Sequence, residues 1–250
     1  MKRNVVAATL LTLCFTLSGC FGIEEKILIH KDGSGVFTYT LDVTEMMKQM
    51  MEMVGTLEKA FKDDADSTST AKKEPTKLTD KRGEMVEKMK EDFAFNKDGR
   101  MNNVKGISDY REFVDTLDGK LIIGLSFGFN NVNSLNSALK TMFAKSDKKK
   151  KTDGLPPAIY GFKNGELTRE VPKDKVEGLV GNDNDSEAVK KMMKGFKYVV
   201  VVEADEKIQT VAAPGAVIEK NGKTVVIDYQ VFDKGDEIIK AKMKSTVKVY

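Results

Sequence analysis

The stretch ILIHKDGSGVFTYTLDV, residues 27–43, decides the fold that the sequence predicts. The apolar residues of its second half alternate with polar ones: Phe37, Tyr39, Leu41 and Val43. This period of two is typical of a strand with one buried face. Between the two halves, Asp32-Gly33-Ser34-Gly35 supplies the positive φ angles that a tight reversal needs. Residues 27–43 therefore predict a β-hairpin.

Further reversals of this kind follow along the chain, at Asp118-Gly119, Asn164-Gly165 and Asn221-Gly222. Each lies between residues of strand character. The predicted strands around and beyond them cover residues 121–129, 198–203, 208–212, 225–231 and 238–249. Widely spaced hairpins favour antiparallel pairing over an alternation of strand and helix.

Helical periodicity interrupts the strands. Apolar residues at helical spacing run from Met46 to Phe61, behind Thr44 as a helix cap, and again from Met85 to Phe93. We expect these two helices to form a hairpin inserted between strands, with residues 62–82 as the flexible polar loop between them.

Two further helices are predicted at 135–143, behind the Asn-rich cap of residues 130–133, and at 189–196. The predicted fold class is therefore α+β: an antiparallel β-sheet built from hairpins, packed with an inserted α-helical hairpin and further helices.

The N-terminus carries a different signal. Lys2 and Arg3 form a basic start, an apolar run continues to Leu17, and small residues precede Cys20. This is the layout of a secretory signal, too short for a stable membrane span. Its last four residues, Leu17-Ser18-Gly19-Cys20, resemble the lipobox of bacterial lipoproteins. The resemblance implies cleavage before Cys20 and two or three acyl chains, palmitate among them, on that cysteine.

The predicted organisation is a signal peptide at 1–19, a tether at 20–26 and a single α+β domain at 27–250. One acyl chain holds a protein at a bilayer only marginally, whereas two or three hold it firmly. Phe21 stands where enteric lipoproteins retained in the inner membrane carry aspartate, and Glu24-Glu25 resembles the acidic residues of surface-exported lipoproteins. We therefore expect a lipid-anchored cell-envelope protein of the outer membrane, facing the periplasm or the surface, rather than of the inner membrane.

The composition excludes several classes of function. After removal of the signal the chain has 39 basic and 38 acidic residues, whereas a general nucleic-acid binder is strongly basic. Cys14 leaves with the signal and Cys20 is expected to carry lipid, so no thiol is left for a disulfide, a zinc site or a nucleophile. The domain must rely on its hydrophobic core.

The sequence offers no catalytic constellation. His30 is the one histidine, and no serine or cysteine stands in a recognisable nucleophile turn, so an exposed strand histidine is expected. Residues 183–187 are acidic like the start of a calcium loop, but Ala188 and Lys194 replace its glycine and glutamate. We expect no enzyme activity, no cofactor and no metal.

Methionines gather at the start of the first predicted helix: Met46, Met47, Met50, Met51 and Met53. Thioether side chains are flexible and polarizable, so they fill cores and also form adaptable binding surfaces. They are soft ligands for Cu(I) as well. Packing within the helical hairpin is the first expectation, a surface for a ligand or partner the second and a metal site the third.

The last predicted strand places lysines on one face: Lys240, Lys242, Lys244 and Lys248. Lysines on the exposed side of a terminal strand discourage edge-to-edge aggregation. The same row is a possible membrane-facing surface, since each lysine near anionic headgroups contributes about 1 kcal/mol.

A wider resemblance covers much of the mature chain in outline. It rests on the hairpin at residues 29–35, the strand end and helix start at 127–139, the strand at 198–203, Ala213-Pro214-Gly215 and the turn and strand at 220–231. These features resemble the LppM-like domain of bacterial envelope lipoproteins. The resemblance implies an α+β domain on a lipid anchor, without established catalytic residues.

Together these observations predict a membrane-anchored cell-envelope lipoprotein that acts as a non-enzymatic binding or structural module. Its expected partners are the membrane, through the anchor, and another envelope protein. The alternative is a carrier or sensor of an apolar or lipid ligand, held between the sheet and the Met-rich helices.

Overall fold

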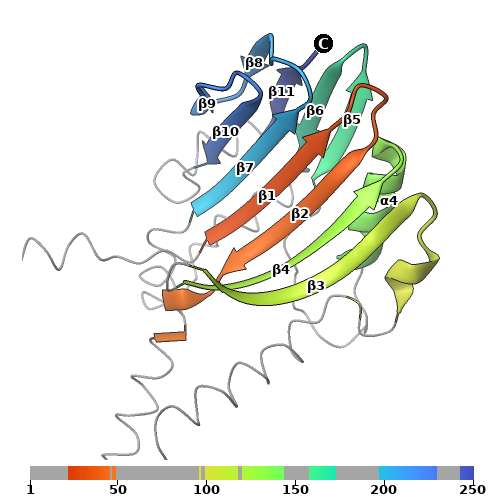
Figure 1. The fold of residues 1–250 in the computed structure, drawn as a ribbon, viewed down its shortest axis with the longest axis vertical. Coiled ribbons are helices and arrows are strands. Elements are labelled where there is room, and N and C mark those ends of the chain that lie inside the picture. Colours follow the sequence, from red (N-terminus) through yellow and green to blue (C-terminus); the bar gives the residue numbers. More distant parts are fainter. Residues whose placement is uncertain are drawn as a thin grey trace, which may run out of the picture.

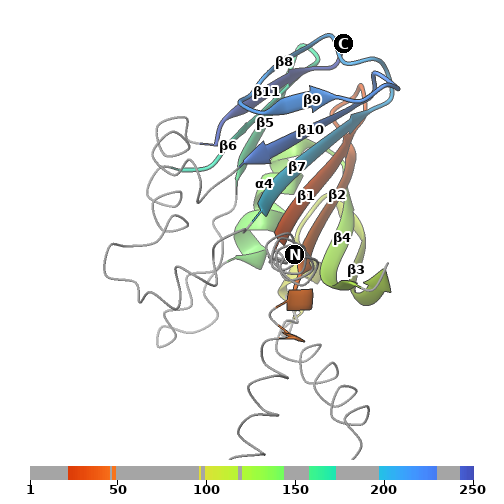
Figure 2. The ribbon, with the colours of Figure 1, turned by 90° about the vertical axis from the view of Figure 1, so that its left-hand side faces the viewer.

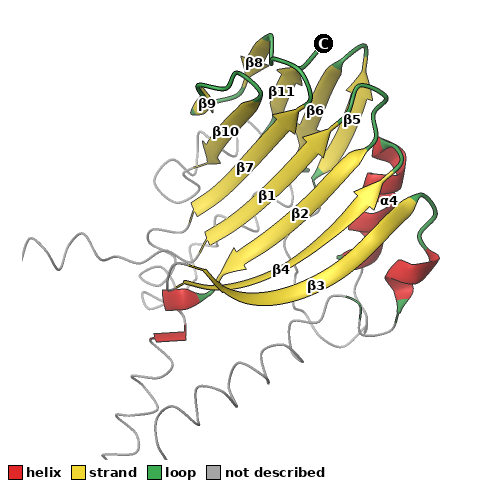
Figure 3. Ribbon diagram, in the orientation of Figure 1, coloured by secondary structure: helices red, strands yellow, loops and turns green. Residues whose placement is uncertain are grey.

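The computed structural model describes residues 22–45, 47–48, 96, 99–117, 120–143, 158–172, 197–229 and 243–250. These residues are mostly in strands (Figure 3). The strands are β1 (Gly22–Ile29), β2 (Gly35–Asp42), β3 (Ile107–Leu117), β4 (Lys120–Phe129), β5 (Ile159–Lys163), β6 (Glu166–Glu170), β7 (Lys197–Ala204), β8 (Thr210–Ala212), β9 (Ala216–Ile218), β10 (Thr224–Tyr229) and β11 (Ser245–Lys248). The helical elements are η1 (Arg100–Asn103), a 3-10 helix, and α4 (Val132–Met142).

The strands form two sheets (Figure 1). The larger sheet has seven strands in the order β3-β4-β2-β1-β7-β10-β9, and the smaller has four in the order β5-β6-β11-β8. β1 lies inside the larger sheet, antiparallel to β2 and parallel to β7. Figures 1 and 2 show α4 and the smaller sheet on the same side of the larger sheet.

The predicted fold class is wrong. The described residues are predominantly strand, with α4 as their one α-helical element, and the larger sheet is mixed rather than antiparallel. Alternation shows which face of a strand is buried but does not identify its neighbour, so the parallel pairing of β1 with β7 was missed. The predicted helical hairpin, the 62–82 loop and the 189–196 helix lie outside the described residues, apart from helical backbone at Thr44, Glu45, Met47 and Lys48.

The hairpins themselves are confirmed. Residues 27–43 form the β1–β2 hairpin, and β3–β4, β5–β6 and β9–β10 pair in the same way. Gly33 has a φ of 82°, and Asn164 and Gly165 have φ angles of 51° and 72°. Two consecutive positive φ angles are what a two-residue hairpin turn with the right-handed twist of a sheet requires.

The helix predicted at 135–143 is confirmed as α4. The side chain of Asn131 caps it by accepting a 3.0 Å hydrogen bond from the Ser134 amide. Its buried face, which includes Leu135, Ala138 and Leu139, joins the inward side chains of the larger sheet in one hydrophobic core. None of the described helices has the length and apolar character needed to cross a membrane.

The structure differs from the predicted tether at 20–26. β1 begins at Gly22, and Gly22 is paired with both Asp42 of β2 and Lys197 of β7. Ile23 and Glu25 are buried. Residues 22–26 are therefore part of an interior strand, and the acidic Glu25 belongs to the core.

Candidate functional site

A buried ion pair joins the two sheets. Glu25 of β1 and Arg169 of β6 are 5% and 2% exposed, and Arg169 Nε donates to Glu25 Oε2 at 2.7 Å. Both side chains lie at inward positions of their strands, beside apolar residues such as Ile27 and Leu167. A buried charge is tolerated only when it is paired and its remaining hydrogen bonds are made.

Tyrosines complete the surroundings of this pair. Tyr160 of β5 donates to Glu25 Oε2 at 2.8 Å, and Tyr198 of β7 donates to Glu25 Oε1. Arg169 Nη2 donates to the Tyr198 hydroxyl at 3.0 Å, and Nη1 donates to the Met243 carbonyl at 3.1 Å. The guanidinium also lies 5.4 Å and 5.7 Å from the ring centres of Tyr198 and Tyr229, within range of a cation–π contact.

The electrostatics keep this cluster charged and its hydroxyls protonated. Burial alone would raise the pKa of Glu25, but the charge of Arg169 and the hydrogen bonds from Arg169, Tyr198 and Tyr160 hold it below its usual value. Burial and the nearby Glu25 charge raise the pKa values of Tyr160 and Tyr198 well above their usual value. The cluster is a structural link between sheets, closed to a ligand from solvent.

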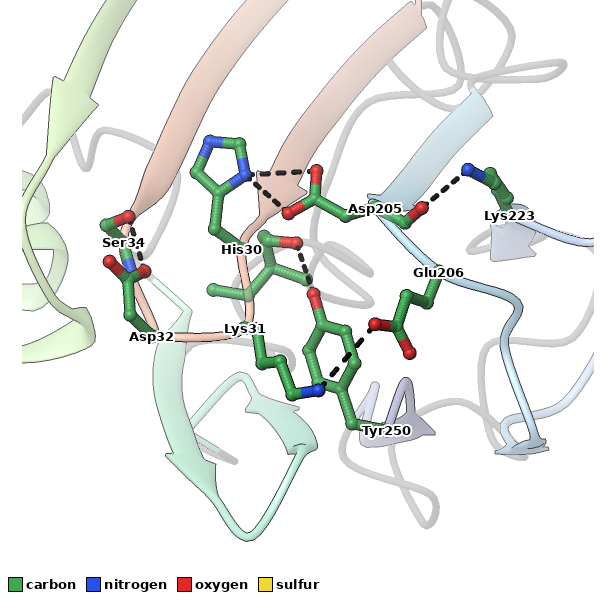
Figure 4. A network of polar contacts seen from close by, with 9 residues as sticks. His30, Lys31, Asp32, Ser34, Asp205, Glu206, Lys223 and Tyr250 are labelled. Carbon is green, nitrogen blue, oxygen red and sulfur yellow. Dashed lines mark hydrogen bonds and ion pairs between the residues drawn. The ribbon is translucent and has the colours of Figure 1, made fainter.

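A second polar network lies at the other end of β1 (Figure 4). His30 Nδ1 contacts the Asp205 carboxylate oxygens at 3.1 Å and 2.9 Å. Lys223 Nζ donates to the Asp205 carbonyl at 2.5 Å, and Lys31 lies 3.6 Å from Glu206. The network ties the β1–β2 hairpin tip to the segment after β7 and to the turn before β10.

The geometry around His30 does not assemble a nucleophile. Because an ionised carboxylate only accepts hydrogen bonds, the Nδ1 atom donates to Asp205. Two hydroxyls drawn near His30 in Figure 4 donate to other groups: Ser34 Oγ donates to Asp32 at 2.6 Å, and Tyr250 donates to the Ile29 carbonyl at 3.2 Å. The side chain of His30 is 40% exposed. These contacts suit a structural link at the surface, between the β1–β2 turn and the segment that follows β7.

Few of the sequence-predicted site residues fall within the described part of the chain. Met47 is 5% exposed and belongs to the hydrophobic core, as the packing interpretation expects. Cys20, Met46, Met50, Met51 and Met53, with Lys240 and Lys242, lie outside the described residues. Across the part of the chain that the structure describes, no three His, Cys, Asp or Glu side chains gather as a metal site would require.

Lys244 and Lys248 are exposed, and Lys244 lies 3.9 Å from Glu170. Lys248 belongs to β11, which lies between β6 and β8 and so is not an edge of its sheet, and Lys244 comes directly before this strand. Lys248 therefore does not protect a sheet edge, and for Lys240 and Lys242, which lie outside the described residues, that interpretation stays a prediction. The edges of the smaller sheet are β5 and β8, and α4 covers part of β5 through Asn136, which exchanges hydrogen bonds of 2.8 Å and 2.9 Å with the backbone of Tyr160.

The sequence interpretation missed Glu25, Arg169 and Asp205. A signal existed for the first two. In both GIEEKILI and ELTRE the strand alternation places one charge on the apolar face, and the two charges have opposite sign. No local signal identifies Asp205, because its contact with His30 joins residues 175 positions apart.

Comparisons with known proteins add little. No family model matches the chain, and no curated protein does. Among solved structures, the chain is similar to the folded domain of LppM from Mycobacterium tuberculosis, with 10% identity, a TM-score of 0.38, and coverage of 92% of this chain and 90% of that chain. A likeness at this level establishes neither a common function nor a common family.

Proposed function

We propose that this chain is a membrane-anchored lipoprotein of the bacterial cell envelope and that its body is a non-enzymatic binding or structural module. The observation that carries the proposal is the order of two features. The lipobox-like Leu17-Ser18-Gly19-Cys20 ends two positions before Gly22, where the folded body begins. Removal of a secretory signal that ends directly before the first strand would leave Cys20 as the first residue of the mature chain. Cys20 would then be the residue to which lipid is attached.

The physical basis of the anchor is the burial of acyl chains. Each buried methylene contributes about 0.8 kcal/mol, so two or three chains retain the protein at the bilayer without any spanning helix. Phe21 in place of aspartate favours the outer membrane over the inner membrane. Only Glu24 of the acidic pair is exposed, so the resemblance to a surface-export signal is reduced to one residue, and the periplasmic face is the better proposal.

The absence of catalysis is proposed from the polar groups that the structure describes. Glu25 and Arg169 are enclosed, and His30 has no hydroxyl directed at it. A general base needs the group it deprotonates within hydrogen-bond reach. A binding role, with another envelope component as partner, fits these residues better than turnover does.

The test is membrane fractionation of cells that produce the wild-type chain, Cys20→Ala or Cys14→Ala. We expect Cys20→Ala to leave the membrane fraction, because it has no residue to acylate. The matched Cys14→Ala chain should stay with the membrane, because Cys14 belongs to the part that is removed. Retention of the Cys20→Ala chain at the membrane would contradict the proposal. Separation of the inner and outer membranes by density tests whether the wild-type chain lies in the outer membrane.

The alternative function, a carrier of an apolar or lipid ligand, stays a prediction. Met47 is buried in the core and makes no surface for a ligand. The other methionines of the cluster lie outside the described residues.

A further inference from the structure

We infer that the domain stands upright on its membrane, on the end of the larger sheet where β1 begins, with the β1–β2 and β9–β10 turns directed away from the bilayer. This inference rests on the proposed attachment of lipid at Cys20. It identifies the membrane-facing surface of the domain.

The first step is the shortness of the connection. Gly22 is held from both sides, by pairing with Asp42 and with Lys197, so the chain is fixed from this residue onward. The two residue steps from Cys20 to Gly22 span at most about 7 Å even when fully extended. The start of β1 must therefore lie close to the lipid headgroups.

The second step is the direction of the strands. β1 runs eight residues from Gly22 to Ile29, about 23 Å at the usual rise of a strand. Figure 1 shows that the β1–β2 turn lies at the end of the sheet opposite to the start of β1. The β9–β10 turn lies at that same far end, because Thr224 pairs with Glu203 near the end of β7. The start of β1 is thus at the end of the sheet opposite to these two turns, which form the hairpin-tip end. The paired ends of β3 and β4, Leu117 and Lys120, lie instead at the end where β1 begins, because Ile122 of β4 pairs with Asp42.

The third step concerns a domain that lies flat on the outward face of the larger sheet. That face includes the partly exposed ion pair between Lys26 and Glu203, at 2.8 Å. Pressing it against acyl chains would remove water from these polar groups, which is costly.

The upright arrangement changes the interpretation of the C-terminal lysines. The Val249 amide donates to the Gly165 carbonyl at 2.8 Å, and the Tyr250 hydroxyl donates to the Ile29 carbonyl, so Lys248 lies at the hairpin-tip end. At physiological salt, electrostatic attraction is screened over about 8 Å. Lys248 is at the end of the domain opposite to the start of β1 and faces away from the membrane.

The experiment uses the mature lipoprotein in vesicles whose lipid headgroups carry a nitroxide quencher. Single cysteines at three exposed or half-exposed lysines receive a fluorophore: Lys197→Cys beside the start of β1, Lys26→Cys midway along it, and Lys220→Cys in the β9–β10 turn. Cys14 is removed with the signal and the sulfur of Cys20 is expected to be thioether-linked to lipid, so neither reacts with the label. We expect quenching to fall from Lys197 to Lys26 and to be at background at Lys220.

A linker variant is the control. About twenty Gly and Ser residues inserted before Gly22 give a mean reach of about 25 Å, comparable to the length of β1, and should abolish the gradient. Equal quenching at Lys197 and Lys220 in the unmodified chain would overturn the inference, and equal quenching at Lys26 and Lys197 would indicate a flat domain. Mass analysis of the same preparation separates the two claims: without acyl chains on Cys20 the proposed function fails, and with them only the orientation is at stake.

Discussion

At the scale of single residues, the ion pair of Glu25 and Arg169 is the most demanding feature of the fold. Removing the charge of Glu25 leaves a buried guanidinium without its counter-charge, which typically costs about 3–5 kcal/mol. That is a large part of the free energy of unfolding of an ordinary domain.

We therefore expect Glu25→Gln to lower the free energy of unfolding by about 3–5 kcal/mol. Urea unfolding of the mature chain in mild detergent measures it. The matched control is Glu24→Gln, the exposed neighbour, which should change stability by no more than about 0.5 kcal/mol. Equal effects of the two substitutions would show that the buried pair contributes nothing specific.

The pH dependence of stability follows from the same residue. The pKa of Glu25 lies below its usual value of 4.5 in the folded chain. The stability it contributes is therefore fully present above pH 4.5 and is lost as the pH falls through the lower, folded-state pKa. Unfolding measured from pH 7 to pH 3 should show the gap between wild type and Glu25→Gln narrowing only below about pH 4.5. A gap that is constant across this range would contradict the assigned ionisation.

At this scale the sequence holds a signal for the buried charge at Glu25. The alternation in residues 22–29 places Glu25 among Ile23, Ile27 and Ile29, so a charge inside the core was open to prediction. The residue that pairs with Glu25 could not be predicted in this way, because Arg169 lies 144 positions away in the sequence. Local periodicity determines the direction of a side chain, and long-range pairing determines its partner.

At the scale of elements, α4 is joined to the edge strand β5 by one side chain. Asn136 accepts from the Tyr160 amide and donates to the Tyr160 carbonyl, at 2.9 Å and 2.8 Å. It satisfies backbone groups at the edge of the smaller sheet, where another chain would otherwise pair.

Asn136→Ala should destabilise the fold by about 1–3 kcal/mol, since both backbone groups lose their partner. It should also speed hydrogen exchange at the Tyr160 amide. Asn133→Ala, on the exposed side of the same helix, is the matched control and should leave both quantities nearly unchanged. Unchanged exchange in Asn136→Ala would refute the role of this side chain.

Two glycines of the β1–β2 hairpin make a second test of an element. A Cβ at Gly35 would overlap the Leu28 carbonyl oxygen and lie 2.7 Å from the Phe129 ring, whereas a Cβ at Gly22 would meet nothing closer than 3.8 Å. Gly35→Ala should cost about 3 kcal/mol, at the upper end of overpacking, because backbone must shift. Gly22→Ala should be neutral or slightly stabilising. Thermal unfolding of both variants measures the difference in stability. Similar unfolding midpoints would contradict the close packing at Gly35.

For the elements, the sequence was informative wherever local chemistry determines structure. The turns at Gly33, Asn164 and Gly222 and the cap at Asn131 were all predicted from residue type. The mixed sheet was not, because the parallel pairing of β1 with β7 depends on residues far apart in the chain. The start of β1 was placed five residues late, since the charges at Glu24 and Glu25 masked its alternation.

At the scale of the whole molecule, the main feature is the short distance along the chain between Cys20 and Gly22, where β1 begins. A lipoprotein with a long linker can reach partners in many orientations, whereas this body, with lipid on Cys20 as proposed, would be held at its first strand. A partner in the envelope would therefore meet the hairpin-tip end, where His30, Asp205 and Lys223 form their network.

The central claim is that Cys20 is the lipid-bearing first residue of the mature protein. Mass spectrometry of the mature N-terminal peptide tests it most directly. The account predicts a peptide that begins at Cys20 and carries two or three acyl chains. A free thiol at Cys20, or a leader peptide still attached to a protein free of lipid, would contradict it.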